Sequence, residues 1–266
     1  MKMHLTREVR FSVNPFQNTQ IEGYNPYASK PATTGLGLFF ELGIEVSGPI
    51  DPKTGFVVNV CEIDQSVRST VVPLFVDRIC NCFSRGRNLT LSDLDQLLRI
   101  SCRLLGTVFD SISLETLTLK LNPYRKMAFS ALGEAMVYYS EKFEFAAMHK
   151  LWNDSFDKAK NDEIFGKCAN PAGHGHNYII EVTIKASEAS KLDPINYERA
   201  VDTSLINILD HKNLNEDVPY FQEHNPTMEN IAKFAWSQLL PELGLERLHC
   251  ITVWESDRTQ CSYFGP

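Results

Sequence analysis

Three histidines in the C-terminal half have the residue type and spacing of a metal site. His174 and His176 flank one glycine, and residues two apart on a β-strand point to the same face of the sheet. Both imidazoles would then converge on one ion, with His149, at the end of the preceding predicted strand, as third ligand. Three neutral imidazoles without a fourth protein ligand are typical of catalytic zinc. Taken alone, the His-x-His pair is as compatible with a polar surface, or with histidines that are hydrogen-bonded in a core, as it is with a zinc site.

Further residues of this half could move protons or bind a ring. Cys168 precedes His174 by six residues and fits a fourth ligand, a buried apolar residue or a thiol that zinc and imidazoles turn into a base. Asp210 and His211 follow a predicted helix, on which adjacent residues do not face each other, so their pairing requires a turn. The alternative for His211 is a favourable charge near a helix C-terminus. Glu255 is either a solvated strand end or a carboxylate aimed at the N–H donors of a heterocycle.

The elements that must position these residues alternate in type along the C-terminal half. Period-2 and β-rich segments predict strands at 142–148, 177–184 and 248–254. Apolar residues at helical spacing predict helices at 197–209 and 225–240. We expect Asn225 to cap the second helix, Pro226 to occupy its first turn and Pro241 to end it. A polar loop is predicted at 153–170.

The N-terminal half repeats this order and predicts an internal duplication. Its expected strands are 9–13, 38–47, 56–60 and 117–121, and its expected helices are 63–76 and one that begins near Asn88. Gly35-Leu36-Gly37-Leu38 stands where the other half has Gly173-His174-Gly175-His176, and Asp77-Arg78 stands near the place of Asp210-His211. Because both histidines are leucine in this copy, and Pro15 stands opposite His149, only the C-terminal copy would hold the chemistry. A chance similarity of two α+β halves is the alternative.

Composition limits the classes of partner. The chain has 266 residues, 43% hydrophobic and 22% charged, with a net charge of −7. This suits two ordinary domains with apolar cores, predicted at 1–133 and 134–266, and offers no basic field for nucleic acid or anionic membrane. We find no apolar run of signal-peptide or membrane-helix length. None of the seven cysteines forms a C-x-x-C pair, so we expect reduced thiols and a cytoplasmic protein.

Five stretches resemble, in order, the 6-pyruvoyl-tetrahydropterin synthase family, which includes the 6-carboxytetrahydropterin synthases of queuosine biosynthesis. They are FEFAAMHKL, FGKCANPAGHGHNY, ILDHKNLNEDVPYF, NPTMEN and VWESD. The resemblance covers roughly residues 143–263, and the segment from the cysteine to GHGHNY is highly specific. It implies the T-fold, a four-stranded antiparallel sheet with two helices on one face. We therefore expect an α+β tandem T-fold chain whose N-terminal copy is degenerate.

The resemblance also assigns roles and a substrate. The implied zinc ligands are His149, His174 and His176; the implied proton-transfer set is Cys168, Asp210 and His211. Glu255 would anchor a pterin ring, with Thr227 beside it. The implied substrate is 7,8-dihydroneopterin triphosphate, and loss of triphosphate would give 6-pyruvoyl-tetrahydropterin, a step of tetrahydrobiopterin biosynthesis. Family units close into barrels with sites at subunit interfaces, so we expect a homo-oligomer, such as a trimer of tandem chains.

Other functions stay open for this sequence, and one segment departs from the family pattern. Five residues separate Cys168 from His174, as in the pyruvoyl-forming members, whereas the carboxy-forming members more often have three. A non-catalytic zinc- or pterin-binding module would not need the whole proton-transfer set, and a tandem nitrile reductase would not need three histidines. Residues 185–201 lack the glycine-containing hairpin of the family, so a returning strand there is in doubt. The N-terminal half keeps such a hairpin at 48–59.

Overall fold

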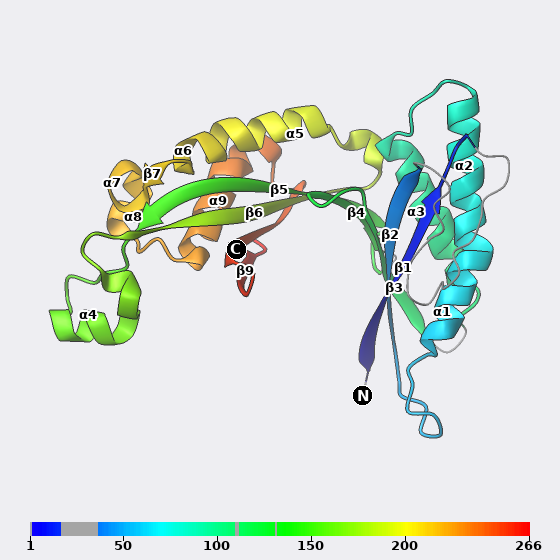
Figure 1. Cartoon of the computed structure of the whole chain (residues 1–266), viewed down its shortest axis with the longest axis horizontal. Coiled ribbons are helices and arrows are strands. Elements are labelled where there is room, and N and C mark those ends of the chain that lie inside the picture. The colour runs from blue at the N-terminus through cyan, green and yellow to red at the C-terminus, as the bar shows by residue number, and fades with distance from the viewer. Residues whose placement is uncertain (1, 17–36, 110–111, 131) are drawn as a thin grey trace. The chain divides into compact units, whose positions relative to one another are not determined.

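The computed structural model describes residues 2–16, 37–109, 112–130 and 132–266 (Figure 1). They form two compact units, Met1–Tyr139 with Ala186–Leu192, and Ser140–Lys185 with Asp193–Pro266. The boundary predicted at 133/134 and the interpretation of the units as two copies stay predictions. The α+β class is confirmed, since helices accompany antiparallel strands in the described ranges. No helix within those ranges is long and apolar enough to span a bilayer.

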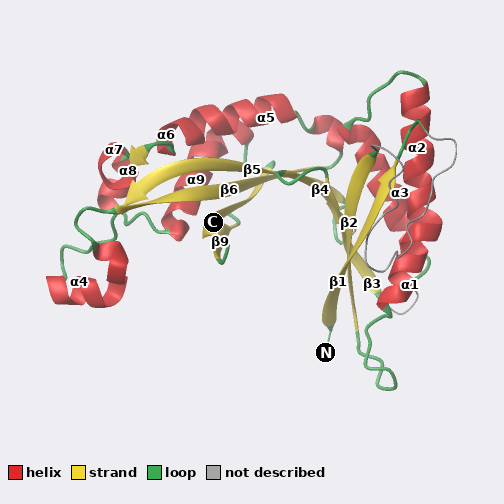
Figure 2. Ribbon diagram, viewed as in Figure 1, coloured by secondary structure: helices red, strands yellow, loops and turns green. Residues whose placement is uncertain are grey.

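The first unit is an antiparallel sheet with helices on one face (Figure 2). Its strands, in spatial order, are β1 (Met3–Val13), β2 (Leu38–Gly48), β3 (Ser113–Lys120) and β4 (Arg125–Ser130). Its helical segments are α1 (Val60–Ser66), a π-helical turn (Val67–Val71), α2 (Val72–Ser84), α3 (Leu91–Gly106) and a short 3-10 turn (Ala189–Lys191). Alternate residues of β1 and β2 are buried, and Phe75 of α2 packs against Phe11 and Phe40 at ring-centroid distances of 5.3 and 5.5 Å. The period of 2 thus places one face of these strands in the core.

One expectation for the first unit is wrong. Residues 56–60 form no strand, because Asn59 accepts a hydrogen bond from the Cys61 amide and caps α1, which begins at Val60. β2 already has β1 and β3 on its two edges, so no edge of β2 is left for a returning strand. Residues 122–124 form a turn in which the Asn122 carboxamide accepts from the Tyr124 and Arg125 amides, and β4 begins at Arg125.

The N-terminal segments that were proposed to correspond to the catalytic motifs can be compared with them only in part. Gly35 and Leu36 lie outside the described residues. Asp77 and Arg78 lie inside α2, which continues to Ser84, whereas Asp210 follows the end of a helix. The two pairs therefore do not occupy equivalent local structures, and this proposed correspondence is wrong.

The segment that follows β6 of the second unit packs within the first unit. Its Ala189 amide donates to Asp95 Oδ2 of α3 at 2.9 Å, and Arg99 Nη2 donates to the Ser187 carbonyl at 2.5 Å. Residues 186–192 thereby close onto α3 instead of forming the returning strand of a hairpin. The doubt raised about this hairpin is confirmed.

The second unit is built on a sheet with the strand order β5-β6-β8-β9. These strands are β5 (Met136–His149), β6 (His174–Ala186), β8 (Leu248–Ser256) and β9 (Thr259–Tyr263), and β7 (Lys212–Asn213) pairs in parallel with the end of β5. The main helices are α5 (Pro194–Val201), continued by a π-helical turn (Asp202–Ile206) and α6 (Asn207–Leu209), and α9 (Met228–Leu243). Tyr178, Ile180 and Val182 of β6 are fully buried, and Tyr197 of α5 donates to the Val182 carbonyl at 2.7 Å.

The predicted strands and helices of this unit are present, with changes at their ends. The predicted polar loop contains α4 (Lys158–Phe165) and a 3-10 turn (Gly166–Ala169). The buried side chain of Asn161 holds this segment in place of an apolar residue, because its Nδ2 donates to three backbone carbonyls. Thr227, not Asn225, caps α9, and Pro241 lies inside the helix, which ends only at Leu243. The small helices α7 (Leu214–Asp217) and α8 (Pro219–Glu223) and the strand β9 were not predicted.

Candidate functional site

Three histidines and one carboxylate converge where β5 ends and β6 begins. The possible ligand atoms of His149, His174, His176 and Glu255 all lie within 4.8 Å of one another. His149 Nε2 is 3.2 Å from His174 Nε2 and 3.4 Å from Glu255 Oε1, which is 2.9 Å from His176 Nε2. Alternation along β6 places both of its histidines on one side of the strand, as the spacing predicted. Glu255 comes from the end of β8, and its place in this group was not predicted.

The protonation of His149 is set by a backbone carbonyl. His149 is buried, and its Nδ1 lies 2.8 Å from the Pro226 carbonyl oxygen. Because a carbonyl oxygen only accepts, Nδ1 carries the proton and the Nε2 lone pair points into the cluster. Burial lowers the pKa of His149 and of His176. The imidazoles are therefore held toward the neutral form that binds metal.

An orphaned nitrogen supports the fit of a metal ion. His176 Nε2 is buried and has no hydrogen-bond partner within the described ranges, and the nearby Glu255 oxygen does not take up hydrogen-bond geometry with it. A buried nitrogen without a partner costs free energy. Three imidazole nitrogens with an adjacent carboxylate oxygen form a donor set that suits zinc. These residues therefore fit a divalent transition metal.

Tyr178 is a further member of this environment that the sequence did not single out. It is fully buried, its hydroxyl lies 3.3 Å from His149 Nδ1, and its ring stacks on Phe145 at a centroid distance of 4.9 Å. Burial, with the Glu255 charge, raises the pKa of Tyr178 far above its ordinary value. Tyr178 therefore stays uncharged, and its buried ring lies beside the histidines. In the sequence, the position of this tyrosine at the end of the GHGHNY motif could have indicated it.

Cys168 lies in the 3-10 turn before β6 and is partly exposed. Its carbonyl accepts from the Leu151 amide at 2.9 Å, which ties this turn to the chain just after His149. Burial, and secondarily the Glu255 carboxylate, raise the pKa of the Cys168 thiol. The chain itself therefore favours the thiol, and the expected thiolate requires a cation nearby.

The turn that an Asp210–His211 pair requires is present. Asp210 is extended, and His211 adopts φ 56°, a left-handed conformation that is uncommon outside glycine. This geometry brings His211 Nδ1 to 2.8 Å from Asp210 Oδ2. The Ala146 amide donates to Asp210 Oδ1 at 2.8 Å, and the His211 amide donates to the Ala146 carbonyl at 2.6 Å. The hydrogen bond from Ala146 and then that from His211 lower the pKa of Asp210, so the pair is an oriented carboxylate with an exposed imidazole.

Two hollows in the second unit adjoin this region. One of about 430 Å³ is bordered by both His176 and His211. The other, of about 600 Å³, is bordered by His149 and by the loop that contains Asn225. The first hollow therefore joins a candidate metal ligand to a candidate proton carrier. Thr227 accepts from the Asn230 amide at 3.4 Å as the α9 cap, one residue after the Pro226 carbonyl.

A second group of histidine and carboxylates lies in the first unit. His4 Nδ1 is 3.5 Å from Glu45 and 3.8 Å from Glu115. Glu115 Oε1 is already bonded by Lys2 Nζ at 2.6 Å and by the Ser47 hydroxyl. We interpret this group as a surface ion-pair cluster, because an ammonium ion already neutralises its most buried carboxylate.

Fold and geometry together define the class of protein, an α+β protein with a histidine-rich site suited to metal-assisted proton transfer. A family model described as 6-pyruvoyl tetrahydropterin synthase matches residues 138–266. The 6-pyruvoyl tetrahydrobiopterin synthase of Poecilia reticulata is 34% identical over 50% of this chain and 93% of its own length. The chain therefore belongs to the 6-pyruvoyl tetrahydropterin synthase family and is an enzyme of the lyase class.

Two further similarities were found. The 6-carboxy-5,6,7,8-tetrahydropterin synthase of Rickettsia typhi is 26% identical over 33% of this chain and 77% of its own length. A solved structure of Caenorhabditis elegans 6-pyruvoyl tetrahydropterin synthase has 28% identity and a TM-score of 0.47, covering 49% of this chain and 96% of its own. The family model begins at residue 138, so the N-terminal half lies outside its match.

Proposed function

We propose that the chain is a zinc-dependent lyase that converts 7,8-dihydroneopterin triphosphate into 6-pyruvoyl-tetrahydropterin and triphosphate. The observation that carries the proposal is the convergence of three imidazoles, two of which have a buried nitrogen without a hydrogen-bond partner among the described residues, beside an oriented Asp–His pair. The relative from Poecilia reticulata bears the name of this activity. The five-residue interval between Cys168 and His174 favours the pyruvoyl product.

In this proposal His149, His174 and His176 hold the zinc. When bound, zinc would stabilise negative charge on the side-chain oxygens of the substrate and thereby acidify neighbouring protons. Pro226 keeps the Nε2 lone pair of His149 available through its bond to Nδ1. Tyr178 and the burial of His149 exclude water from that side of the cluster.

The protons are moved by groups of the chain. Asp210 holds the Nδ1–H of His211, so the Nε2 of His211 is the atom that accepts and returns a proton at the 430 Å³ hollow. Cys168 exchanges the second proton through its thiol. Hydrogen atoms pass from the side-chain carbons of the substrate to its ring while triphosphate leaves, so the reaction balances without an external oxidant. Positioned acids and bases of this kind typically contribute about 10²–10⁴-fold.

Glu255 keeps its proposed role as the anchor of the pterin ring. A carboxylate can accept from two adjacent N–H donors of the ring at once. Its oxygen now lies beside His149 and His176, so the opposing assignment is a fourth metal ligand. Thr227, next to the Pro226 carbonyl, is proposed to lie beside the ring.

Incubation of the full chain with zinc and dihydroneopterin triphosphate, followed by mass spectrometry, tests the function. We expect 6-pyruvoyl-tetrahydropterin and free triphosphate, and no product from His174→Ala, which should also lose zinc. His4→Ala is the matched control, since His4 lies in the ion-pair cluster of the first unit. A 6-carboxytetrahydropterin product would place the chain in queuosine biosynthesis instead, and binding of zinc and pterin without turnover would make it a binding module.

A further inference from the structure

A loop before α9 connects that helix to His149. The Pro226 carbonyl, the acceptor for His149 Nδ1, belongs to a three-residue turn in which the Thr227 amide donates to the Asn225 carbonyl at 2.8 Å. This i to i+2 pattern is that of a γ-turn, and the inverse form has a central φ near −75°, close to the value that proline imposes. Pro226 is therefore suited to the centre of the turn, where its own carbonyl points at His149.

Two side-chain hydrogen bonds hold this turn in place. Asn230 Nδ2, one turn into α9, donates to the Asn225 carbonyl at 2.8 Å. The Asn225 side chain accepts from the Trp152 amide at 2.9 Å, just after β5. The carbonyl of Asn225 thus receives the Thr227 amide and the Asn230 amide group together, which fixes the peptide unit that precedes Pro226. Asn230 therefore acts on His149 only through the turn.

The first unit has the same pattern with a different residue at the key position. Asn88-x-Thr90-x-x-Asp93 at the start of α3 parallels Asn225-x-Thr227-x-x-Asn230 at the start of α9. Both threonines cap their helices by accepting from the residue three positions later. Among the three positions of this pattern, only the third helical position, Asp93 or Asn230, differs in residue type.

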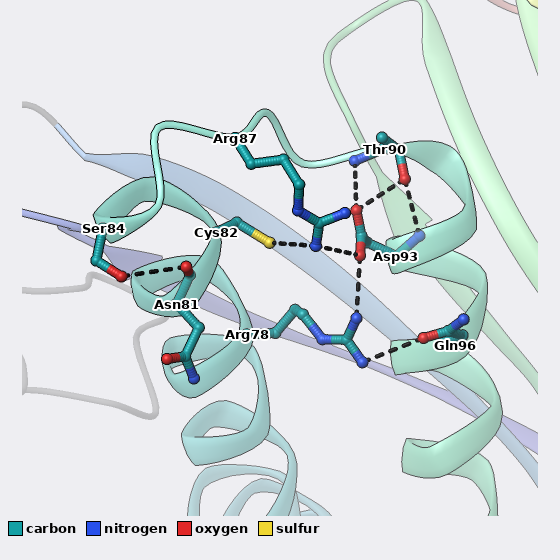
Figure 3. Close-up of polar contacts among 8 residues, drawn as sticks. All are labelled: Arg78, Asn81, Cys82, Ser84, Arg87, Thr90, Asp93 and Gln96. Atoms are coloured by element: carbon teal, nitrogen blue, oxygen red, sulfur yellow. Dashed lines mark hydrogen bonds and ion pairs between the residues drawn. The ribbon is translucent and has the colours of Figure 1, made fainter.

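That side chain has different hydrogen-bond partners in the two helices. Figure 3 shows the Asp93 carboxylate accepting from the Thr90 amide and hydroxyl and from Arg78 and Arg87, with Arg78–Asp93 and Arg87–Asp93 distances of 3.0 and 3.1 Å. A carboxylate has no N–H with which to hold a carbonyl. Asn230 has one, and it uses that N–H to hold the Asn225 carbonyl.

We propose that Asn230 is a positioning residue that holds the Pro226 carbonyl against His149 and thereby strengthens metal binding. The inference rests on the metal-binding part of the proposed function and is independent of the substrate. Groups that orient a metal-bound histidine typically change metal affinity by about 10–100-fold when removed. Asn230→Ala should weaken zinc binding by about tenfold or more. Asn230→Asp should do the same, because its carboxylate would repel the Asn225 carbonyl.

The test measures zinc affinity of the metal-free full chain by competition with a chromophoric chelator, and the visible absorption of the cobalt-substituted protein. Asn196→Ala is the matched control. Asn196 occupies the third position of α5, where its amides bond the Asp193 cap, and it does not belong to the loop before α9. Asn230→Ala and Asn230→Asp should weaken zinc binding and alter the cobalt spectrum, whereas Asn196→Ala should change neither. Circular dichroism compares the folding of all variants. Two substitutions are made at position 230 so that the test can still be carried out if one of them misfolds.

Three results would separate the possible failures. Wild-type zinc affinity in a folded Asn230→Ala chain would overturn the positioning role. Equal weakening in Asn196→Ala would assign the effect to helix capping in general and overturn it as well. A wild-type chain that binds no zinc, or binds it without need of His174, would instead overturn the proposed metal site on which this inference rests.

Discussion

At the scale of single residues, we propose that one set of side chains holds the metal and another moves protons. Cys168 does not appear in the His–Glu group whose ligand atoms lie within 4.8 Å, at least among the described residues. Its thiol is made less acidic by burial and by Glu255. We therefore expect Cys168 to transfer protons and not to bind the metal, which stays a proposal.

Cys168→Ala should therefore keep its zinc while turnover falls by about 10²–10⁴-fold, the usual contribution of a general acid–base group. Metal analysis and product formation are measured on the same sample. Cys61→Ala, at an exposed cysteine of the first unit, controls for thiol loss. Loss of zinc together with activity would make Cys168 a fourth ligand.

Glu255→Gln distinguishes the two assignments of this carboxylate. As ring anchor, Glu255 should matter for pterin affinity, because neutralising it leaves the ring donors with a weaker, mismatched partner. We expect pterin binding, measured by fluorescence titration, to weaken at least tenfold with unchanged zinc content. Unchanged pterin affinity with reduced zinc content would instead make Glu255 a metal ligand, as its 2.9 Å approach to His176 allows.

At the scale of elements, the junction of α2 and α3 depends on one buried carboxylate. Burial alone would raise the pKa of Asp93, but the hydrogen bonds from Thr90 and the Arg87 guanidinium outweigh it and lower the pKa from 3.8 to about 2. The folded state therefore prefers the charged form more than the unfolded state does, by roughly 1 to 2 kcal/mol. This stabilisation is present above pH of about 4 and is lost as the pH falls toward 2.

Asp93→Asn should lower the free energy of unfolding at neutral pH and flatten its dependence on pH between about 4 and 2. Urea unfolding at several pH values, followed by circular dichroism, measures both effects. Asp257→Asn, at a side chain 92% exposed, is the control. An unchanged slope in the acid range would contradict the assignment of this titration to Asp93.

Elements with a strong period were predictable, and elements held by polar groups were not. β6 was found because its buried residues alternate, and the histidine pair was found because the same alternation sets its spacing. α4 was missed because its anchor is the buried amide of Asn161. The Pro226 carbonyl was missed because a backbone acceptor leaves no side-chain pattern in a sequence, although NPTMEN marked its neighbourhood.

At the scale of the whole molecule, all the residues that we propose for the chemistry lie in the half of the chain that the family model matches. If family-like sites form between chains, we propose that catalytic halves contact catalytic halves. An N-terminal half in their place would present Asp77 and Arg78 within a continuous helix, where no Asp–His turn exists. Mixtures of Cys168→Ala and His211→Ala chains should then regain part of the wild-type turnover, since some sites would combine intact residues from both.

Product formation after subunit exchange measures this recovery. Exchange itself is verified with differently tagged chains, and each variant alone is the baseline. Confirmed exchange without recovered turnover would mean that one chain supplies each complete site.

The loop 186–192 also bears on the history of the gene. The polypeptide crosses between the two units near residues 139, 185 and 192, so no single break in the coding sequence separates them cleanly. A truncated gene that began at residue 140 would leave this loop without the Asp95 and Arg99 bonds that hold it. A duplicate that has lost its chemistry can ordinarily be deleted by drift. If the N-terminal half is such a duplicate, as we propose, its deletion would leave residues 186–192 without these bonds, and selection on folding would favour its retention.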